Sequence, residues 1–241
     1  ALQQAVHQWK AAGAHQQPPS RWSPDRWQSR FPEHAEYLAE LPQPSSRTDV
    51  IARCLAASKG PEQATKAFIA AMIWGYGPVG YGGYRTKRVL TENDGAGETL
   101  AAVAGIARDQ GGPAAFEWLA RRQNRLRYLG VAVATTYLFF SAANAIAPPA
   151  LVLDRLVRDW MANTLDWPLN LEWDVEDYRE YVDRMSAWAA GLDIEPGNLE
   201  MLVFQLAANG DPQSLWRAPD LFASAPSEST SQVRDEIADD S

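Results

Sequence analysis

Apolar residues in this chain recur at intervals of three and four positions, and this spacing constrains the fold more than any other feature of the sequence. Such spacing gathers apolar side chains on one face of a helix, whereas a half-buried strand needs strict alternation. From residue 47 onward the helical spacing dominates, and neither a convincing alternating run nor an internal repeat is found. The sequence therefore predicts an all-α fold.

Glycine and proline residues mark the boundaries of the expected helices, because they stop one helix or start the next. The clearest boundaries are Gly60-Pro61, Gly111-Gly112-Pro113 and Pro148-Pro149. We expect helices over residues 47–58, 61–75, 97–110, 114–125, 133–146, 148–165, 178–190 and 196–208. Prolines break the first 45 residues, which we expect to form an irregular and partly helical segment that packs on the core through Trp22 and Trp27.

The composition excludes several classes of protein. Hydrophobic residues make up 46% of the 241 positions and charged residues 22%, which is enough for a core and excludes wholesale disorder. The single cysteine, Cys54, excludes an internal disulfide framework and a cysteine-based zinc site. The three histidines all precede residue 35, so we expect no metal and no cofactor. Residues 224–241 are rich in Ser, Asp and Glu, and we expect an acidic disordered tail there.

The sequence begins without a basic and then apolar signal segment. The most apolar run covers residues 131–147, contains four polar residues and is about three residues short of a typical ~20-residue membrane span. A buried helix is the better interpretation of this run. We therefore expect a cytoplasmic protein without a membrane partner.

The net charge of −8 is unevenly distributed. Residues 50–160 carry 13 Lys and Arg against 8 Asp and Glu, whereas residues 161–241 carry 4 against 17. A basic middle beside an acidic remainder suggests a face that binds a polyanion. The alternative is that the basic and the acidic residues only form two solvent-exposed faces of an acidic protein.

Three segments carry residues suited to chemistry. The first, residues 74–88, interleaves five glycines with Trp74, Tyr76, Tyr81 and Tyr84 and ends in Arg85, Lys87 and Arg88. Glycine lets a backbone approach a ligand, aromatic rings stack, and basic side chains suit phosphates. The alternative is an interhelical loop whose aromatic residues fill gaps in the core.

The second segment covers residues 126–136. We expect a helix bearing Arg121, Arg122, Arg125 and Arg127 to reach Gly130, where the chain turns and a new helix starts near Val133. Backbone N–H groups and the positive end of that new helix could hold a phosphate. A helical corner with a solvated arginine face is the alternative.

The third segment, residues 148–161, places Asp154 among apolar residues. A carboxylate there is unfavourable unless it is paired, caps a helix or has a chemical role. Arg155 and Arg158 are the candidate partners for a purely structural aspartate.

The order of these segments resembles the OGG-fold glycosylases, bacterial relatives of 8-oxoguanine DNA glycosylase in the helix-hairpin-helix superfamily. The matching stretches are residues 74–77, 80–82, 129–140 and 151–154, and residues 196–204 are similar to the family's last core helix. The resemblance covers about residues 20–210. It implies a helix-hairpin-helix bundle of two lobes with a cleft, over residues 46–223.

The resemblance also implies an activity on double-stranded DNA that contains a modified base. Members of this family flip the base out and cleave its N-glycosidic bond, and Asp154 matches the aspartate that stabilises the sugar cation or activates the attacking group. We expect DNA contacts from Leu129, Gly130, Val131, Val133, Thr135, Arg85, Lys87, Arg88, Arg125 and Arg127.

One position departs from the family pattern. Many members carry a lysine nucleophile where this chain has Thr136, and a hydroxyl cannot form a Schiff base. We therefore expect water to be the nucleophile and the enzyme to be monofunctional. It should leave an intact strand with an abasic site, and borohydride should trap no covalent adduct between protein and DNA.

The expected base pocket contains Trp74, Tyr76, Tyr81, Tyr84, Phe140, Glu200 and Phe204. Phe140 lies one helical turn after Thr136, and Glu200 and Phe204 lie one turn apart. Ordinary core packing is the alternative for both phenylalanines. The candidate substrates are an oxidised purine and a hypermodified phage cytosine, which implies DNA repair or antiphage defence by a monomer.

A catalytically silent helix-hairpin-helix DNA-binding module is the alternative function, and a protein-interaction domain is a remoter one. Asp154 discriminates the first two possibilities. In an enzyme its carboxylate opens into a cleft, whereas in a binding module it can be buried in an ion pair.

Overall fold

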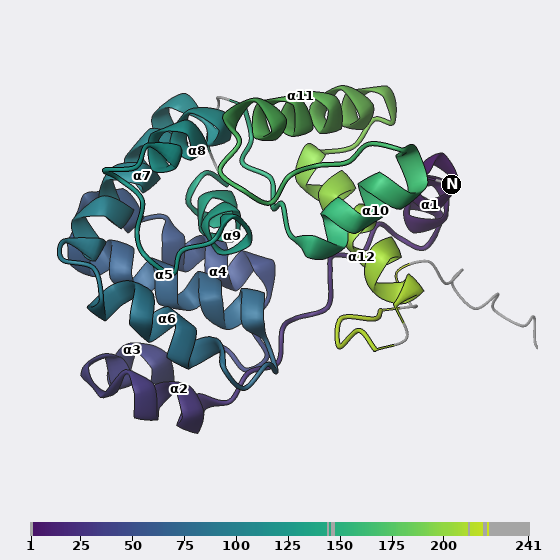
Figure 1. The fold of residues 1–241 in the computed structure, drawn as a ribbon. Coiled ribbons are helices and arrows are strands. Elements are labelled where there is room, and N and C mark those ends of the chain that lie inside the picture. The colour runs from purple at the N-terminus through teal and green to yellow at the C-terminus, as the bar shows by residue number, and fades with distance from the viewer. Residues whose placement is uncertain (1, 144, 146–147, 212, 219–220, 222–241) are drawn as a thin grey trace, which may run out of the picture.

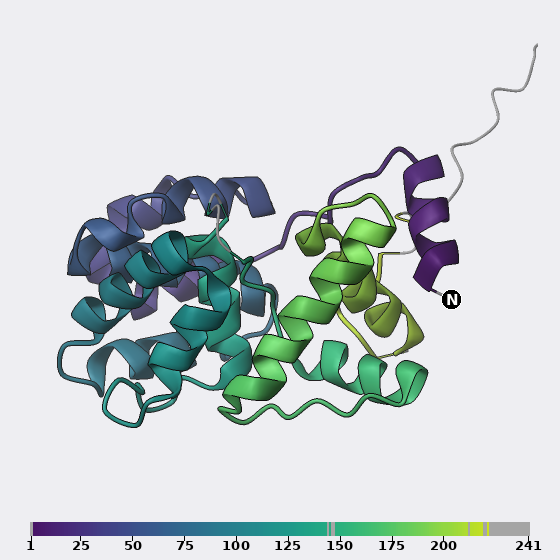
Figure 2. The same ribbon diagram turned by 90° about the horizontal axis from the view of Figure 1, so that it is seen from above.

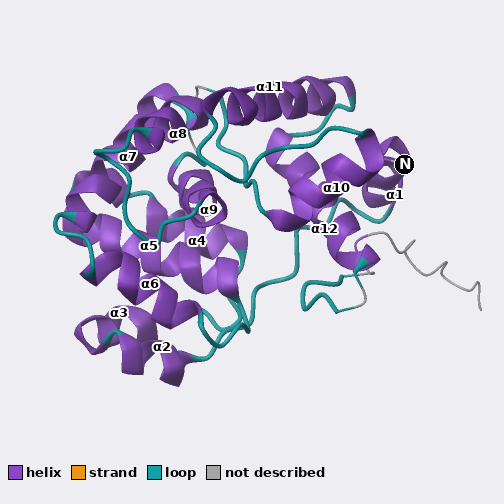
Figure 3. Ribbon diagram, viewed as in Figure 1, coloured by secondary structure: helices purple, strands orange, loops and turns teal. Residues whose placement is uncertain are grey.

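The computed structural model describes residues 2–143, 145, 148–211, 213–218 and 221. Every regular element among them is a helix, and the isolated bridge between Ser20 and Ser45 is the one β-type pairing that they form (Figure 3). The expected all-α fold is confirmed. The expected tail over residues 224–241 lies outside the described residues.

The helices form two lobes, which Figures 1 and 2 show side by side. The first lobe contains α2 (Pro24–Arg30), α3 (Ala35–Ala39), α4 (Arg47–Cys54), α5 (Pro61–Tyr76), α6 (Gly82–Thr91), α7 (Ala96–Gln110), α8 (Gly112–Ala120) and α9 (Val131–Ser141), with the short 3-10 helices η1 (Pro32–His34) and η2 (Ala57–Lys59). The second contains α1 (Leu2–Ala11), α10 (Arg155–Leu165) and α12 (Pro196–Gly210). Helix α11 (Val175–Gly191) packs on both α8 and α12 and thereby joins the lobes.

Helix α5 is the centre of the first lobe and packs against α4, α6, α7 and α9. Every residue from Ala67 to Trp74 is buried, which is the pattern of a helix surrounded on all sides. Its alanines let the neighbouring helices approach closely. This packing fixes the C-terminal end of α5, with Trp74 and Gly75, at the boundary with the second lobe.

Residues 148–154 are irregular, so the expected helix beginning at Pro148-Pro149 is wrong; α10 begins only at Arg155. Side chains of other helices form the hydrogen bonds with this backbone that a helix would have formed internally. The Tyr178 hydroxyl donates to the Leu151 carbonyl at 2.9 Å and accepts from the Leu151 N–H at 3.2 Å. The Tyr181 hydroxyl donates to the Val152 carbonyl at 2.8 Å.

The expected helix over residues 114–125 is also shorter than predicted, because α8 ends at Ala120. Side chains from the following turn donate hydrogen bonds to the last carbonyl groups of this helix. Asn124 donates to the Trp118 carbonyl, and Arg125 donates to that of Ala120. Helix α9 extends from Val131 to Ser141 rather than over residues 133–146, of which residues 144 and 146 are not described.

The sequence prediction missed α6, because two glycines begin it. Gly82 is required by packing, since a Cβ atom there would lie 2.6 Å from the Cβ atom of Tyr76. The N-terminal segment, expected to be irregular and partly helical without assigned bounds, contains α1, α2 and α3.

The N-terminal segment belongs to both lobes. Helix α1 packs on α12, whereas α2 packs on α3 and α6, so the chain crosses from one lobe to the other between residues 12 and 23 (Figure 1). Within the described ranges, no helix combines the length and the apolarity needed to cross a membrane.

Candidate active site

A cavity of about 90 Å³ lies where the two lobes meet. Its walls come from α4, α5 and α9 of the first lobe and from α10 and α12 of the second. The lining residues are Gln17, Arg47, Trp74, Gly75, Thr136, Val152, Asp154, Leu156, Glu200, Phe204 and Trp216. Five predicted site residues therefore meet in one place, although they are up to 130 positions apart in sequence: Trp74, Thr136, Asp154, Glu200 and Phe204.

Asp154 is the N-cap of α10, and its Oδ1 accepts a hydrogen bond from the Val157 N–H at 2.8 Å. It has no ion-pair partner among the described residues; Arg155 and Arg158 both pair with Asp159 instead. Burial raises the pKa of the Asp154 carboxyl, although the N–H groups of Val157 and Leu156 favour its charged form. The carboxylate is thus held by its own helix and opens into the cavity, which is the arrangement expected of an enzyme.

Thr135 fixes the segment that leads to Asp154. Its hydroxyl accepts a hydrogen bond from the Leu153 N–H at 3.0 Å and donates to the Val131 carbonyl at 2.9 Å. The side chain is fully buried. The structure therefore does not place this side chain, predicted to contact DNA, at the surface; it ties α9 to the residue before Asp154.

Thr136 lies in the cavity wall opposite Gly75. Its hydroxyl donates to the Ala132 carbonyl at 2.8 Å, and a Cβ atom on Gly75 would lie 3.2 Å from the Thr136 methyl group. None of the residues that line the cavity in the described part of the chain is a lysine.

Arg47 and Glu200 form a buried ion pair between α4 and α12 in the cavity wall. Arg47 Nη2 lies 3.0 Å from Glu200 Oε2, and Nη1 donates to the Gly197 carbonyl at 3.2 Å. The pKa of Glu200 is raised to about 7, chiefly by burial; the nearby Asp154 also raises it, and Arg47 lowers it.

Two polar atoms beside this pair have no partner among the described residues. They are Arg47 Nε, a donor, and Gln17 Oε1, an acceptor, and both residues are 7% exposed. A buried polar group without a hydrogen bond costs free energy, so a ligand that supplies partners would bind favourably.

Aromatic rings complete the cavity, but not all those expected. Trp74 and Phe204 line it, and Trp216 joins them with its ring centroid 6.3 Å from that of Phe204. Phe140 is buried behind Trp74, with ring centroids 5.1 Å apart, so it supports the wall instead of lining it.

Tyr76, Tyr81 and Tyr84, which were also expected in the base pocket, do not line this cavity. The chain turns away after Gly75 because α5 ends at Tyr76. Tyr81 is then 54% exposed and Tyr84 49% exposed, on the start of α6.

The expected hairpin precedes α9 and is held by Asn93. The Asn93 side chain accepts from the Arg127 N–H at 2.7 Å and donates to the Arg127 carbonyl at 3.1 Å. The Leu129 and Val131 side chains are buried, which leaves their backbone groups for any contact with DNA. Gly130, the N-cap of α9, is exposed, and Val133 is partly buried one turn later. The first N–H groups of a helix lack partners within it, so the hairpin can bind a phosphate.

One family matches this chain, over residues 13–204, and it is described as "Putative 8-oxoguanine DNA glycosylase OGG-like protein". The chain belongs to this OGG-like family. The resemblance noted in the sequence is thereby confirmed, and membership implies a DNA glycosylase that binds DNA. No curated protein and no solved structure matches the chain.

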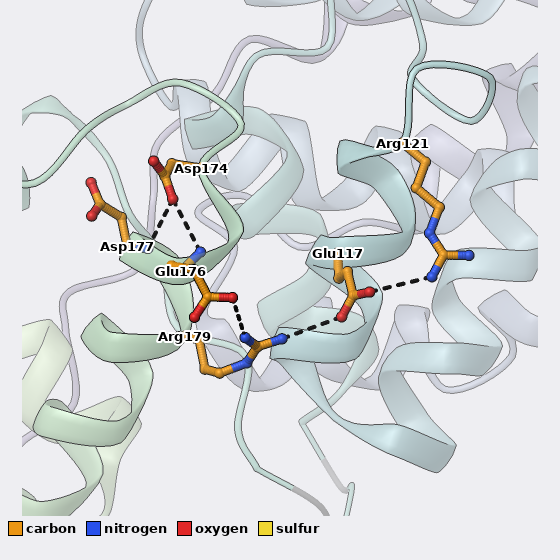
Figure 4. Close-up of polar contacts among 6 residues, drawn as sticks. All are labelled: Glu117, Arg121, Asp174, Glu176, Asp177 and Arg179. Carbon is orange, nitrogen blue, oxygen red and sulfur yellow. Dashed lines mark hydrogen bonds and ion pairs between the residues drawn. The ribbon is translucent and has the colours of Figure 1, made fainter.

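The predicted basic residues of this OGG-like chain differ in their freedom to bind DNA. Lys87 pairs with Glu33, and Arg88 pairs with Glu92. Arg121 pairs with Glu117, which also binds Arg179 of α11 (Figure 4). The Glu117–Arg179 pair joins α8 to α11, whereas Arg121 pairs, among the described residues, only with Glu117, one turn earlier in the chain.

Three other arginines of the predicted set have no carboxylate partner within the described ranges. Arg85 lies over the Tyr81 ring, with 5.7 Å from its guanidinium to the centroid, and Arg127 lies over Tyr128 at 5.3 Å. Arg125 lies over Trp173 at 5.1 Å. None of them reaches the cavity, so any role in DNA binding is at a distance from it.

Sequence reasoning missed Arg47, Gln17 and Trp216. One signal pointed toward Arg47: Glu200 lies in the apolar run LEMLVF, and a buried carboxylate needs a partner. The identity of that partner depends on how α4 meets α12, which no local pattern reveals.

Proposed function

We propose that this chain is a monofunctional DNA glycosylase that uses Asp154 to excise a modified base and leaves an abasic site. The observation that carries the proposal is the unpaired Asp154 carboxylate in the interlobe cavity, beside the aromatic Trp74 and Phe204. A catalytically silent DNA-binding module has no need to hold an unpaired carboxylate in such a place.

The chemistry follows from charge development at the sugar. As the C1′–N bond breaks, its electron pair leaves with the base and positive charge grows on C1′ and O4′. A fixed negative charge at Asp154 stabilises that cation more than it stabilises the neutral substrate. Water then bonds to C1′, the proton that it loses passes to Asp154 and on to solvent, and the departing base takes up a proton from solvent in exchange.

Thr136 explains why water is the nucleophile. Its hydroxyl already donates to Ala132, and the described cavity lining provides neither a lysine nor a histidine to activate it. An imine cannot form without an amine, so the DNA strand stays intact.

Arg47, Glu200 and Gln17 are proposed to read the edge of the flipped base. The free Nε–H group of Arg47 suits a carbonyl oxygen or ring nitrogen, and Gln17 Oε1 suits an amino or ring N–H group. An oxidised purine and a hypermodified cytosine both present donors beside acceptors, and both remain candidate substrates, in DNA repair or antiphage defence.

The test is incubation of the protein with duplexes that each contain one modified base, and with DNA from phages that modify their cytosines. Released bases are identified by mass spectrometry. Release of one base from an otherwise intact strand supports the proposal. Binding to all these DNAs without release of any base would favour the silent DNA-binding module.

A further inference from the structure

A second hollow, larger and more open than the cavity, runs between α2 and the loop that joins α5 to α6. We call it the arginine groove; it encloses about 580 Å³. Arg21, Arg26 and Arg30 line one side, and the glycine-rich loop of residues 77–80 lines the other. In Figure 1, α2 lies below α6 at the lower edge of the molecule.

The three arginines carry uncompensated charge. None of them has a carboxylate within ion-pair distance in the part of the chain that the structure describes, and all three are exposed. Lys87 and Arg88 on the adjoining α6 are paired with Glu33 and Glu92 instead. Asp25, the acidic residue of α2, does not line the groove. The groove is therefore positive, although the whole chain carries a net charge of −8.

The arginines stand on a rigid support. Trp22 and Trp27, which alternate with them in sequence, are buried, and the Trp22 indole donates to the Pro42 carbonyl at 2.9 Å. Ser20 bridges to the backbone of Ser45, and its hydroxyl donates to the Trp74 carbonyl at 2.8 Å. This last bond connects the segment before Arg21 to the wall of the cavity.

The arginine groove and the cavity share a boundary. Gly75 lines the cavity and Gly77 lines the groove, so their Cα atoms are at most about 7.6 Å apart. Trp216 lines the cavity and packs against the other side of Gly77, where a Cβ atom would lie 2.3 Å from the Trp216 ring. Since Gly77 also has a positive φ of 49°, only glycine fits this boundary.

We propose that the arginine groove binds the phosphodiester backbone of the DNA strand beside the flipped nucleotide. Guanidinium groups bind phosphate oxygens through paired hydrogen bonds, and open glycine backbone allows the strand to approach. Neighbouring phosphates of the strand that places a base in the cavity must pass close to its rim, which is where the groove lies. This inference rests on the proposed function, because it assumes that the cavity receives a base from DNA.

Salt dependence measures the contacts directly. The probe is a fluorescein-labelled duplex with a tetrahydrofuran abasic analogue, and its Kd is measured across a series of NaCl concentrations. The double variant Arg26→Gln with Arg30→Gln should bind more weakly and reduce the slope of log K against log salt by about two units, one for each lost phosphate contact.

The matched control removes the same amount of charge elsewhere. Arg108 on α7 and Arg184 on α11 are surface arginines paired with Asp109 and Glu180. The double variant Arg108→Gln with Arg184→Gln should keep the parent slope. A slope that falls equally in both double variants would reflect net charge alone and would overturn the inference, as would an unchanged slope in the groove variant.

Cross-linking locates the strand. Cys54 is buried, so a new thiol would react without competition. Ser29→Cys, in the groove, should form a disulfide with a thiol tethered to a phosphate that flanks the abasic analogue, whereas Asp183→Cys on α11 should not. Absence of a Ser29→Cys cross-link at every flanking phosphate would overturn the inference.

The experiments distinguish a failure of the proposed function from a failure of the groove inference. If no modified base is released but the groove variants still lose salt dependence and Ser29→Cys still cross-links, the chain binds DNA through the groove without being a glycosylase. If a base is released but the salt slope of the groove variant is unchanged, the chain is a glycosylase and the inference that the arginine groove binds DNA is wrong.

Discussion

The Asp154 side chain both caps α10 through a hydrogen bond and carries an unpaired negative charge. A single substitution can remove the charge and keep the hydrogen bond. Asparagine is as good an N-cap as aspartate, so Asp154→Asn should keep the bond to the Val157 N–H and the fold. It removes the negative charge that faces the sugar cation, so base release should fall by about 100-fold or more.

Single-turnover release from a base that proves to be a substrate, with circular dichroism as the fold control, measures this effect. Asp154→Ala loses the cap as well and should cost about 1 kcal/mol of stability. Release by Asp154→Asn within a few-fold of the parent would remove Asp154 from the mechanism.

Thr136 leads to a prediction about the product. With no lysine among the described residues of the cavity wall, borohydride should trap no covalent adduct between protein and DNA. The strand should break only after alkali or an added endonuclease. A trapped adduct formed with a true substrate would mean that another amine takes the place of the lysine.

The residues of the site could be predicted in part. Asp154, Glu200 and Thr136 are unusual in their own segments, and the structure gathers them around one cavity. Tyr81 and Tyr84 were equally conspicuous in sequence but are exposed, because the direction of a side chain after a turn depends on where α5 ends. Arg47 gave no local sign of its part, since the two residues that it hydrogen-bonds, Gly197 and Glu200, lie 150 or more positions away.

At the scale of elements, the start of α9 allows a sharp test of phosphate binding. Gly130 has φ −81° and ψ 166°, which any residue can adopt at an N-cap, and a Cβ atom there would meet nothing within 4 Å. Gly130→Asp and Gly130→Asn should both keep or slightly improve stability, because both residues cap helices well.

The two variants should differ in DNA binding. The aspartate places a negative charge where the phosphate would sit, so Gly130→Asp should bind the abasic duplex more weakly than Gly130→Asn at low salt. Equal affinities of the two variants, measured by fluorescence anisotropy, would show that no phosphate contacts this turn.

Helices with apolar spacing could be predicted from sequence, and their ends could not. Residues 61–75 and 196–208 were expected as helices and form most of α5 and α12. The missed irregular stretch over residues 148–154 depends on hydroxyl groups of Tyr178 and Tyr181, which belong to a helix more than 20 positions away. Such long-range hydrogen bonds override local preference.

For the whole molecule, the Arg47–Glu200 pair predicts how stability varies with pH. The groups that face Glu200 are Arg47, Asp154, Tyr178 and Tyr181. Because the Glu200 pKa is about 7 in the fold against 4.5 for a free side chain, the folded state keeps a proton that the unfolded state loses. This contribution to stability is complete below pH 4.5 and is lost as the pH rises through about 7, by at most about 1.4 kcal/mol per pH unit.

Urea unfolding between pH 4.5 and 8 tests this prediction, with Glu200→Gln as the comparison. The variant should be about as stable as the parent at low pH, because the protonated Glu200 is as neutral as glutamine there, and it should lack the parent's decline toward neutral pH. His34, whose pKa is lowered by burial, acts in the opposite direction in both proteins and cancels from the difference. If the stabilities of the parent and of Glu200→Gln change with pH in the same way, the raised pKa of Glu200 is contradicted.

The division of the N-terminal segment between the lobes also sets the order in which the chain can fold during synthesis. Every helix of the first lobe has been synthesised once α9 has left the ribosome, but α1 must wait for α12, from residue 11 to residue 196, to find its packing surface. At ~5–20 residues per second that interval is roughly 10–40 s. In the part of that interval after α9, the nascent chain has every helix of the first lobe and no complete cavity, so Asp154 meets Glu200 only after α12 has been synthesised.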